Sequence, residues 1–174
     1  MWEGGVRVPF IAAWGQSDPT NLWQRKLPIS AGAIRYEIGA CYDLFPIILD
    51  LVDAPLPAGH AVDGQNLRTL LVGQSDPIHP NEFLNHYPHP RRGQSHFFTT
   101  WRKDDWKVRY AYLADGNERN ALYDLAEDPS ESRNLATEHP ELLRSLMRSM
   151  IQKLESMDAV FPVNGGRSLH PIIQ

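Results

Sequence analysis

The chain has 174 residues, of which 42% are hydrophobic and 22% are charged, a composition typical of a folded globular chain and not of a disordered one. Its formal net charge of -4 excludes general binding to nucleic acids or to anionic membranes through bulk charge. No stretch of about 18 apolar residues is present, so no transmembrane helix is expected. We therefore expect neither a nucleic acid nor a membrane as a partner.

The single cysteine and the first residues give two further expectations. Cys41 excludes an internal disulfide framework and a cysteine-rich zinc site. No charged activating motif surrounds Cys41, so we predict a buried structural thiol. Residues 1–5 (MWEGG) directly precede an apolar run and lack the basic and apolar regions of a secretory signal. This is an unusual way for a domain to begin, and we expect a fragment of a longer protein.

The first half of the chain predicts one strand and two helices. Residues 6–14 are nearly all apolar, which is typical of a strand buried on both faces in a parallel sheet. A helix is expected from about Asp43, whose carboxylate can cap the first turn, and it ends before Pro55. A short helix is expected over residues 67–72, before Gly73.

From about residue 80 the pattern changes to short strands and one long helix. Strands are predicted over residues 83–87, 96–102, 106–112 and 121–125, with a hairpin turn at residues 103–105. In the third strand, Lys107 and Arg109 alternate with aromatic and apolar residues, which predicts that their side of the sheet lies in water. A helix with a broad apolar stripe is expected from Pro140 to Met157. Together these elements indicate an α+β fold.

Six short motifs run through the chain in order. They are residues 2–10 (WEGGVRVPF), 42–51 (YDLFPIILDL), 63–67 (DGQNL), 86–89 (HYPH), 102–107 (RKDDWK) and 122–136 (LYDLAEDPSESRNLA). In this order and at this spacing the motifs resemble those of the sulfatases. The chain departs from the family pattern at Ile47, Asn66 and Asp104, where the family has threonine, serine and glycine. The resemblance covers nearly the whole chain.

The resemblance implies an alkaline-phosphatase-like fold. We expect residues 1–79 to form the C-terminal edge of the large α/β domain, and residues 80–174 to form a C-terminal subdomain in which a small antiparallel sheet packs against a helix. The strand at residues 6–14 and the helix near Asp43 would then expose apolar surface, so we expect the fragment to self-associate. Members of the family are typically exported to the periplasm, cell surface or lysosome, and we expect the same of the parent protein.

The chemistry that the resemblance implies depends on residues that we do not find in this sequence. In sulfatases a cysteine or serine in a C/S-x-P-x-R motif becomes formylglycine, whose hydrate attacks sulfur while a divalent metal, usually calcium, holds the sulfate. Cys41 is followed by residues 42–45 (YDLF), which do not match this motif. Asp104 and Asp105 lie in a predicted turn, where solvated charge is expected, and Glu3 is interpreted as a structural carboxylate. We therefore assign no catalytic residue and no metal ligand here, and expect calcium only in the full-length parent.

Two histidines are the candidates for substrate contact. His86 and His89 flank Tyr87 and Pro88, and the proline excludes a regular helix that would bring both imidazoles onto one face as metal ligands. From the family resemblance, either imidazole would donate a hydrogen bond to a sugar hydroxyl or a sulfate at the rim of the pocket. A structural or merely exposed histidine is the alternative.

A group of cationic residues surrounds the predicted hairpin. These residues are Arg91, Arg92, Arg102, Lys103, Lys107 and Arg109. They suit an anionic, sulfated partner, whereas a solvated hairpin is the other interpretation.

Three functions are compatible with these features. The leading hypothesis is a C-terminal fragment of a sulfuric ester hydrolase that shapes the binding of a sulfated small molecule or glycan and is inactive alone. The second is a non-catalytic module that holds sulfated glycans through the cationic hairpin. The third is a fragment of a related phosphoester or phosphonate hydrolase of the alkaline phosphatase superfamily.

Overall fold

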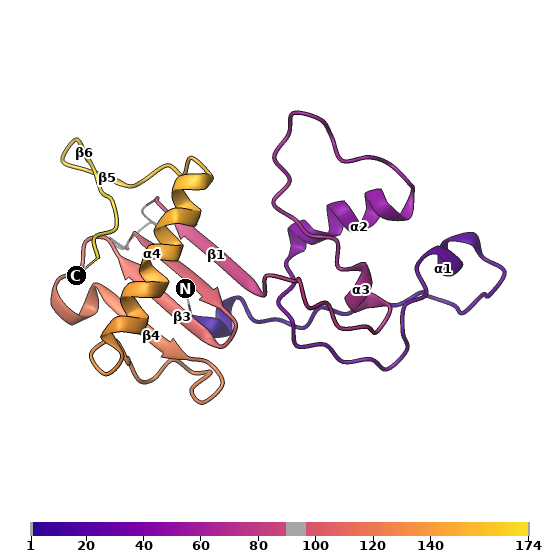
Figure 1. Ribbon diagram of the computed structural model, residues 1–174, viewed down its shortest axis with the longest axis horizontal. Helices are drawn as coiled ribbons and strands as arrows, with labels where there is room; N and C mark the ends of the chain where they lie inside the picture. The colour runs from indigo at the N-terminus through magenta and orange to yellow at the C-terminus, as the bar shows by residue number, and fades with distance from the viewer. Residues whose placement is uncertain (1, 90–96, 174) are drawn as a thin grey trace. The chain divides into compact units, whose positions relative to one another are not determined.

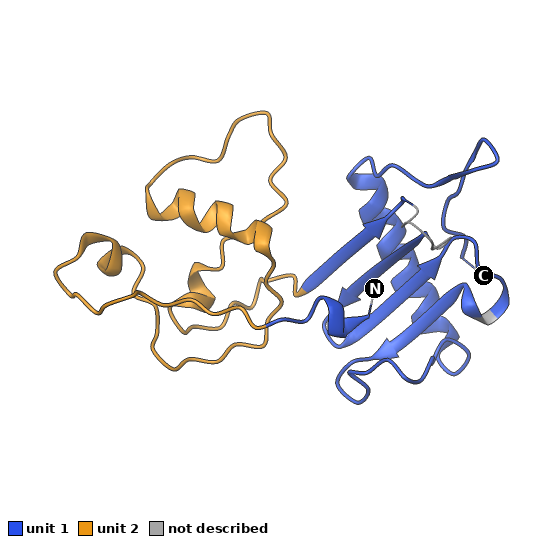
Figure 2. Cartoon of the chain, turned by 180° about the vertical axis from the view of Figure 1, so that it is seen from behind, with its two compact units in different colours: residues 1–8, 82–174 blue, residues 9–81 orange. Residues whose placement is uncertain are grey.

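The chain divides into two compact units, coloured separately in Figure 2. Unit 1 comprises Met1–Val8 and Glu82–Gln174, and unit 2 comprises Pro9–Asn81. The computed structural model describes residues 2–89 and 97–173. Unit 1 thus takes up the first residues of the chain together with nearly all of the predicted segment 80–174. The assignment of residues 1–79 to the edge of a larger domain stays a prediction.

The helices and strands follow the chain in a simple order (Figure 1). Unit 2 contains α1 (Leu22–Lys26), η2 (Cys41–Asp43), α2 (Leu44–Leu51) and α3 (Arg68–Leu71). Unit 1 contains η1 (Glu3–Gly5), β1 (Glu82–Tyr87), β2 (Phe98–Lys103), β3 (Trp106–Ala111), η3 (Gly116–Glu118), β4 (Asn120–Asp124), α4 (Pro140–Ser156), β5 (Val163–Asn164) and β6 (Arg167–Ser168).

The centre of unit 1 is an antiparallel sheet in which each strand pairs with the next one along the chain, in the order β1-β2-β3-β4. Thr100 lies opposite Arg109, and Lys107 lies opposite Tyr123. The predicted strands, the hairpin turn and the α+β class are confirmed. The strand predicted from His96 begins at Phe98, and His96 itself lies outside the described residues.

Helix α4 lies across one face of this sheet, as Figure 1 shows. The predicted helix from Pro140 is confirmed, with Pro140 in the first turn, where its missing N–H is not needed. Its apolar stripe packs on the inward side chains of the strands because residues 3 or 4 apart share one helix face. The buried side chains of this core are Phe97, Trp101, Val108, Tyr110, Tyr112, Met147, Met150 and Leu154.

The opposite face of the sheet carries Lys107, and there the prediction is wrong. The Lys107 side chain is only 2% exposed and donates to Glu3 and Glu131. Residues 2–5 lie at this face, with the Trp2 ring edge-on to the Tyr123 ring at 6.1 Å between centroids. The period-two pattern gave the correct alternation, but the N-terminal turn, which is remote in sequence, covers the side that we expected to be in water.

Unit 2 has a small core and much irregular backbone. Its buried apolar residues are Leu27, Ile47, Leu67 and Leu70. The predicted strand over residues 6–14 is wrong, since this segment forms no strand and Ile11 is 87% exposed. An apolar run becomes a strand only where a neighbouring strand takes its hydrogen bonds, and no such neighbour occurs among the described residues. Cys41 is exposed, so the prediction of a buried thiol is wrong as well.

A buried carboxylate organises the segment around α2. Helix α2 is confirmed, but Asp43 does not cap its first turn through the side chain. The carboxylate accepts hydrogen bonds from the backbone N–H of Ala40 at 2.6 Å and of Gln65 at 2.7 Å. A Cβ on Gly64 would lie 2.2 Å from the carbonyl oxygen of Tyr42, so this close approach requires glycine.

The segment after α4 is less extended than we expected. It contains the short hairpin of β5 and β6, whose turn uses Gly165 and Gly166 at positive φ angles of 56° and 77°. The N–H of Leu169 donates to the carbonyl oxygen of Pro162 at 2.8 Å. Within the described ranges, no helix is both long enough and apolar enough to cross a membrane.

Candidate functional site

The first candidate residue, His86, lies near the end of β1 with both ring nitrogens engaged. Nε2 lies 2.9 Å from the carbonyl oxygen of Val160, and Nδ1 lies 2.7 Å from Oγ1 of Thr99. A carbonyl oxygen only accepts, so Nε2 carries the proton and donates to Val160. In the neutral imidazole, Nδ1 then accepts the hydroxyl proton of Thr99.

This hydrogen-bond chain continues to a buried tyrosine. Thr99 Oγ1 lies 2.9 Å from the hydroxyl oxygen of Tyr112. Burial raises the pKa of Tyr112 to about 12, so the phenol keeps its proton at neutral pH and donates it to Thr99. The rings of Tyr112 and Phe161 lie edge-on to the imidazole of His86, at 6.2 Å and 5.7 Å between centroids. The arrangement ties β1 to the segment that follows α4.

The second candidate, His89, has a different environment. It is exposed, in the bend that follows Pro88, directly before residues 90–96, which lie outside the described part of the chain. Its imidazole is therefore open to solvent, whereas that of His86 is partly buried. A role for either residue in contacting substrate stays a prediction.

The predicted cationic patch is smaller than the sequence suggested. Lys107 is buried in ion pairs, and Arg102 pairs with Glu3 at 3.2 Å, so their charges are compensated inside the fold. The Arg109 guanidinium lies 5.3 Å from the centroid of the Trp2 ring. Arg91 and Arg92 lie outside the described residues. The interpretation of the hairpin as a site for sulfated glycans thus loses two of its cations.

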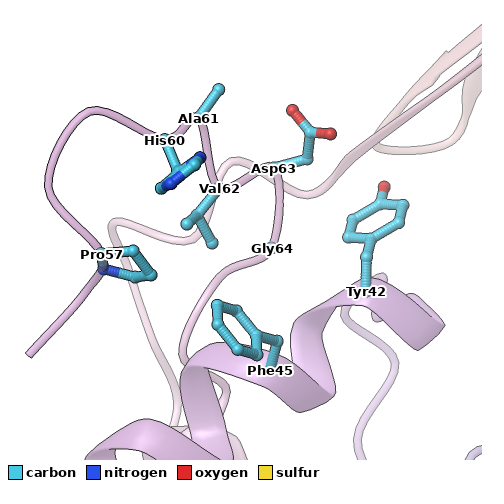
Figure 3. A pocket seen from close by; sticks show the side chains of 8 residues that line it. All are labelled: Tyr42, Phe45, Pro57, His60, Ala61, Val62, Asp63 and Gly64. Carbon is cyan, nitrogen blue, oxygen red and sulfur yellow. The ribbon is translucent and has the colours of Figure 1, made fainter. Parts of the chain in front are cut away.

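A pocket in unit 2 contains residues that the sequence did not single out. Figure 3 shows this pocket of about 500 Å³ from close by. Its lining residues are Tyr42, Phe45, Pro57, His60, Ala61, Val62, Asp63 and Gly64. The lining combines two aromatic rings with one imidazole and one carboxylate, and the carboxylate makes the pocket unfavourable for a sulfate group. No motif pointed to His60, which lies in the irregular segment between α2 and α3.

The described residues also show no cluster suited to a metal ion. Within residues 2–89 and 97–173, no group of three or more His, Cys, Asp or Glu side chains is placed to hold one. The oxygen-rich site that calcium needs therefore does not fit this part of the chain.

Comparisons with known proteins agree on one family. Residues 1–159 match the family described as N-sulphoglucosamine sulphohydrolase, C-terminal. Human arylsulfatase A is 30% identical over 194 residues, covering 99% of this chain and 36% of the relative. The N-acetylgalactosamine-6-O-sulfatase of Bacteroides thetaiotaomicron is 31% identical over 150 residues, covering 83% of this chain and 27% of the relative.

A solved structure extends the likeness to the fold. The structure of BT4656 in complex with its substrate D-glucosamine-2-N,6-O-disulfate matches with a TM-score of 0.64 at 21% identity, covering 75% of this chain and 26% of that chain. At this identity the likeness shows the fold alone. The chain spans between 26% and 36% of the length of the first curated relatives that it matches. The chain belongs to the N-sulphoglucosamine sulphohydrolase C-terminal family, and it is similar to the C-terminal region of the sulfatases.

Proposed function

We propose that this chain is the non-catalytic C-terminal part of a sulfatase, which borders the substrate site of the longer enzyme and does not hydrolyse sulfate esters by itself. The observation that carries the proposal is the match of residues 1–159 to a C-terminal sulfatase family, in a chain that covers about a third of human arylsulfatase A. The formylglycine nucleophile and any calcium ligands then belong to the remainder of the parent protein. The absence of a metal-ligating cluster among the described residues is consistent with this division.

The inactivity of the isolated chain can be tested directly. We expect the purified chain to release no sulfate from 4-nitrophenyl sulfate above a buffer blank, with the full-length protein as the positive control. Turnover that follows the chain through successive purification steps would contradict the proposal.

We further propose that the segment holding His86 and His89 contributes to the rim of the substrate site. His89 is exposed and available for a hydrogen bond to a sulfate or a hydroxyl, whereas His86 must first release Thr99 or Val160. Loss of one such hydrogen bond to a charged group corresponds to a decrease in kcat/KM of about tenfold or more.

The matched experiment compares two exposed histidines in the full-length enzyme. His89→Ala is expected to lower kcat/KM for the natural substrate, whereas His139→Ala, at the start of α4, is expected to leave it unchanged. Circular dichroism of both variants checks that they remain folded. Equal kinetics for the two variants would remove His89 from the site.

The substrate class proposed for the parent is a sulfated saccharide or another sulfated small molecule. The name of the Bacteroides relative and the substrate named in the BT4656 structure are both sulfated amino sugars. Release of sulfate by the full-length protein from a panel of N-, 6-O- and 2-O-sulfated sugars, next to an aryl sulfate, tests this class.

The exposed apolar side chains of unit 2 support a proposal about its partner surface. Ile11, Ile48 and Val52 are exposed, and we propose that the remainder of the parent protein covers them. In isolation these residues are expected to drive self-association, which sedimentation across a concentration series would detect. Ile48→Lys should shift the equilibrium toward monomer, and a chain that is monomeric at every concentration would contradict the proposal.

A further inference from the structure

Three of the motifs that are far apart in the sequence place one charged residue each at a single buried position. Nζ of Lys107 lies 3.1 Å from Oε1 of Glu3 and 2.9 Å from Oε1 of Glu131. The same Glu131 oxygen accepts the backbone N–H of Glu3. Arg102 adds its guanidinium, with NH1 3.2 Å from Oε2 of Glu3. We name these four residues the buried charge cluster.

The buried charge cluster is balanced in charge and removed from water. Two carboxylates face one ammonium and one guanidinium, so their formal charges cancel. The side chains of Glu3, Lys107 and Glu131 are 5%, 2% and 1% exposed. A single charge left in such a place has no water to solvate it, so removing one member leaves the others uncompensated.

The backbone of Glu131 shows that its carboxylate is specifically needed. Glu131 has a φ of 57°, in the left-handed region where glycine is the least strained residue. The loop that presents it is built around the Asp128 carboxylate, which accepts from the hydroxyls of Ser130 and Ser132 and from the N–H of Arg133. These hydrogen bonds lower the pKa of Asp128, the one from the Arg133 N–H most of all, so the carboxylate stays ionised at neutral pH. A strained glutamate held by an ordered loop is expected where the side chain stabilises the surrounding structure.

Trp2 adds contacts beside the buried charge cluster. Its ring lies edge-on to Tyr123, and the guanidinium of Arg109 lies 5.3 Å from its centroid. The turn is closed by backbone bonds from the N–H of Gly5 to the Trp2 oxygen and from the N–H groups of Val6 and Arg7 to the Glu3 oxygen. Residues 2–7 therefore have no regular pairing with the sheet and depend on side-chain contacts to stay on it.

We propose that the buried charge cluster is a lock that holds residues 2–8 on the sheet of unit 1 and so fixes the path by which the chain passes into unit 2. Lys107 is the positioning residue at its centre, because it bonds to both the turn and the loop after β4. This inference stands on the contacts of unit 1 and does not depend on the proposed function.

Hydrogen exchange on the full chain, followed by mass spectrometry, tests the lock. Lys107→Met removes the central charge and keeps most of the side-chain volume. We expect the amides of Gly5, Val6 and Arg7 to exchange at least tenfold faster in this variant, while those of β3 and α4 keep their protection. Lys153→Met is the matched control, because Lys153 pairs with Glu82 at 2.8 Å in an exposed position, and it should leave the exchange of residues 5–7 unchanged.

A second variant keeps the proposal testable if Lys107→Met does not fold. Glu3→Gln leaves the pair of Lys107 and Glu131 in place and weakens only the attachment of the turn. Faster exchange of residues 5–7 with a protected sheet supports the lock. Wild-type exchange of residues 5–7 in Glu3→Gln, or equal effects of Lys107→Met and Lys153→Met, would overturn it.

The strained backbone gives an independent measurement. Glu131→Gly relieves the left-handed conformation but removes the carboxylate, and it is expected to lower the melting temperature of unit 1. Asp158→Gly, at an exposed position with a φ of 49°, is expected to leave the melting temperature unchanged or to raise it. A rise in both variants would show that the Glu131 carboxylate contributes nothing to the lock.

Discussion

Unit 1 and unit 2 differ in how much of their apolar surface they bury. In unit 1, Val108, Met150 and Leu154 have no exposed surface, because α4 closes over the sheet. In unit 2, four buried apolar residues form the core, and Ile48 on α2 remains 55% exposed. Burial of apolar surface is the main favourable term in folding. Unit 1 therefore holds its own stabilising core, whereas unit 2 is suited to lie against another surface.

The sharpest test of this difference is a pair of truncations of similar size. Met150→Ala in unit 1 is expected to lower the free energy of unfolding by about 2–5 kcal/mol, since it leaves a cavity under α4. Ile48→Ala in unit 2 is expected to change it by less than about 0.5 kcal/mol in this chain, because the side chain is already largely in water. Urea denaturation followed by hydrogen exchange of each unit measures both. Similar losses for the two variants would contradict the comparison.

A tight backbone contact in unit 2 gives the next largest effect. Gly64→Ala places a Cβ against the Tyr42 carbonyl and is expected to cost about 1–3 kcal/mol locally, through displacement of the segment that carries the Gln65 N–H. Faster exchange of the Gln65 amide, with unit 1 unaffected, is the expected result. Gly15→Ala, with open space around the new Cβ, is the control. Equal exchange rates in the two variants would show that the close approach is not required.

The smallest effect concerns pH and the buried phenol of unit 1. The pKa of Tyr112 is about 12 in the folded chain and 10.0 for an ordinary tyrosine, because burial disfavours the phenolate. The unfolded chain loses its proton first, so the stability that Tyr112 contributes is complete below about pH 10 and is lost as the pH rises through about 12. Tyr112→Phe should flatten this decline and cost about 1 kcal/mol at neutral pH through the lost bond to Thr99.

Its control is a tyrosine in contact with water. Tyr36→Phe in unit 2, where Tyr36 is exposed, should leave the decline unchanged. Unfolding curves from pH 8 to pH 12 for the wild type and both variants measure the difference. An identical decline in Tyr112→Phe and the wild type would show that another group causes it.

Local patterns in the sequence predicted unit 1 better than unit 2. The stripe of α4 and the alternation in β3 are properties of neighbouring residues, and both are confirmed. The segment 6–14 failed because its apolar composition does not say whether a neighbouring strand is present. Lys107 failed for a related reason, since one of its partners, Glu3, is 104 residues away and belongs to a different motif. The resemblance found the family, but it gave no indication that these motifs meet.

The same was true of the candidate site. The sequence identified His86 and His89 as one type of residue in one segment, and the structure shows different surroundings for each. The partners of His86 come from β2 and from the segment after α4, and Val160 is 74 residues away. No local pattern contains such a contact, and the pocket at His60 is likewise made by segments that come together only in the folded chain.

The distance between Glu3 and Lys107 also has a consequence for synthesis of the protein. Residues 2–8 leave the ribosome before the whole of unit 2, and Lys107 follows Glu3 by 104 residues. At a translation rate of about 5–20 residues per second, Glu3 waits roughly 5–20 s for its partner. During that time Trp2 and the apolar segment that follows it have no sheet to lie on. The first residues of this chain are thus among the last to reach their native place, and the nascent chain is most open to chaperones, and to mispairing, at this end.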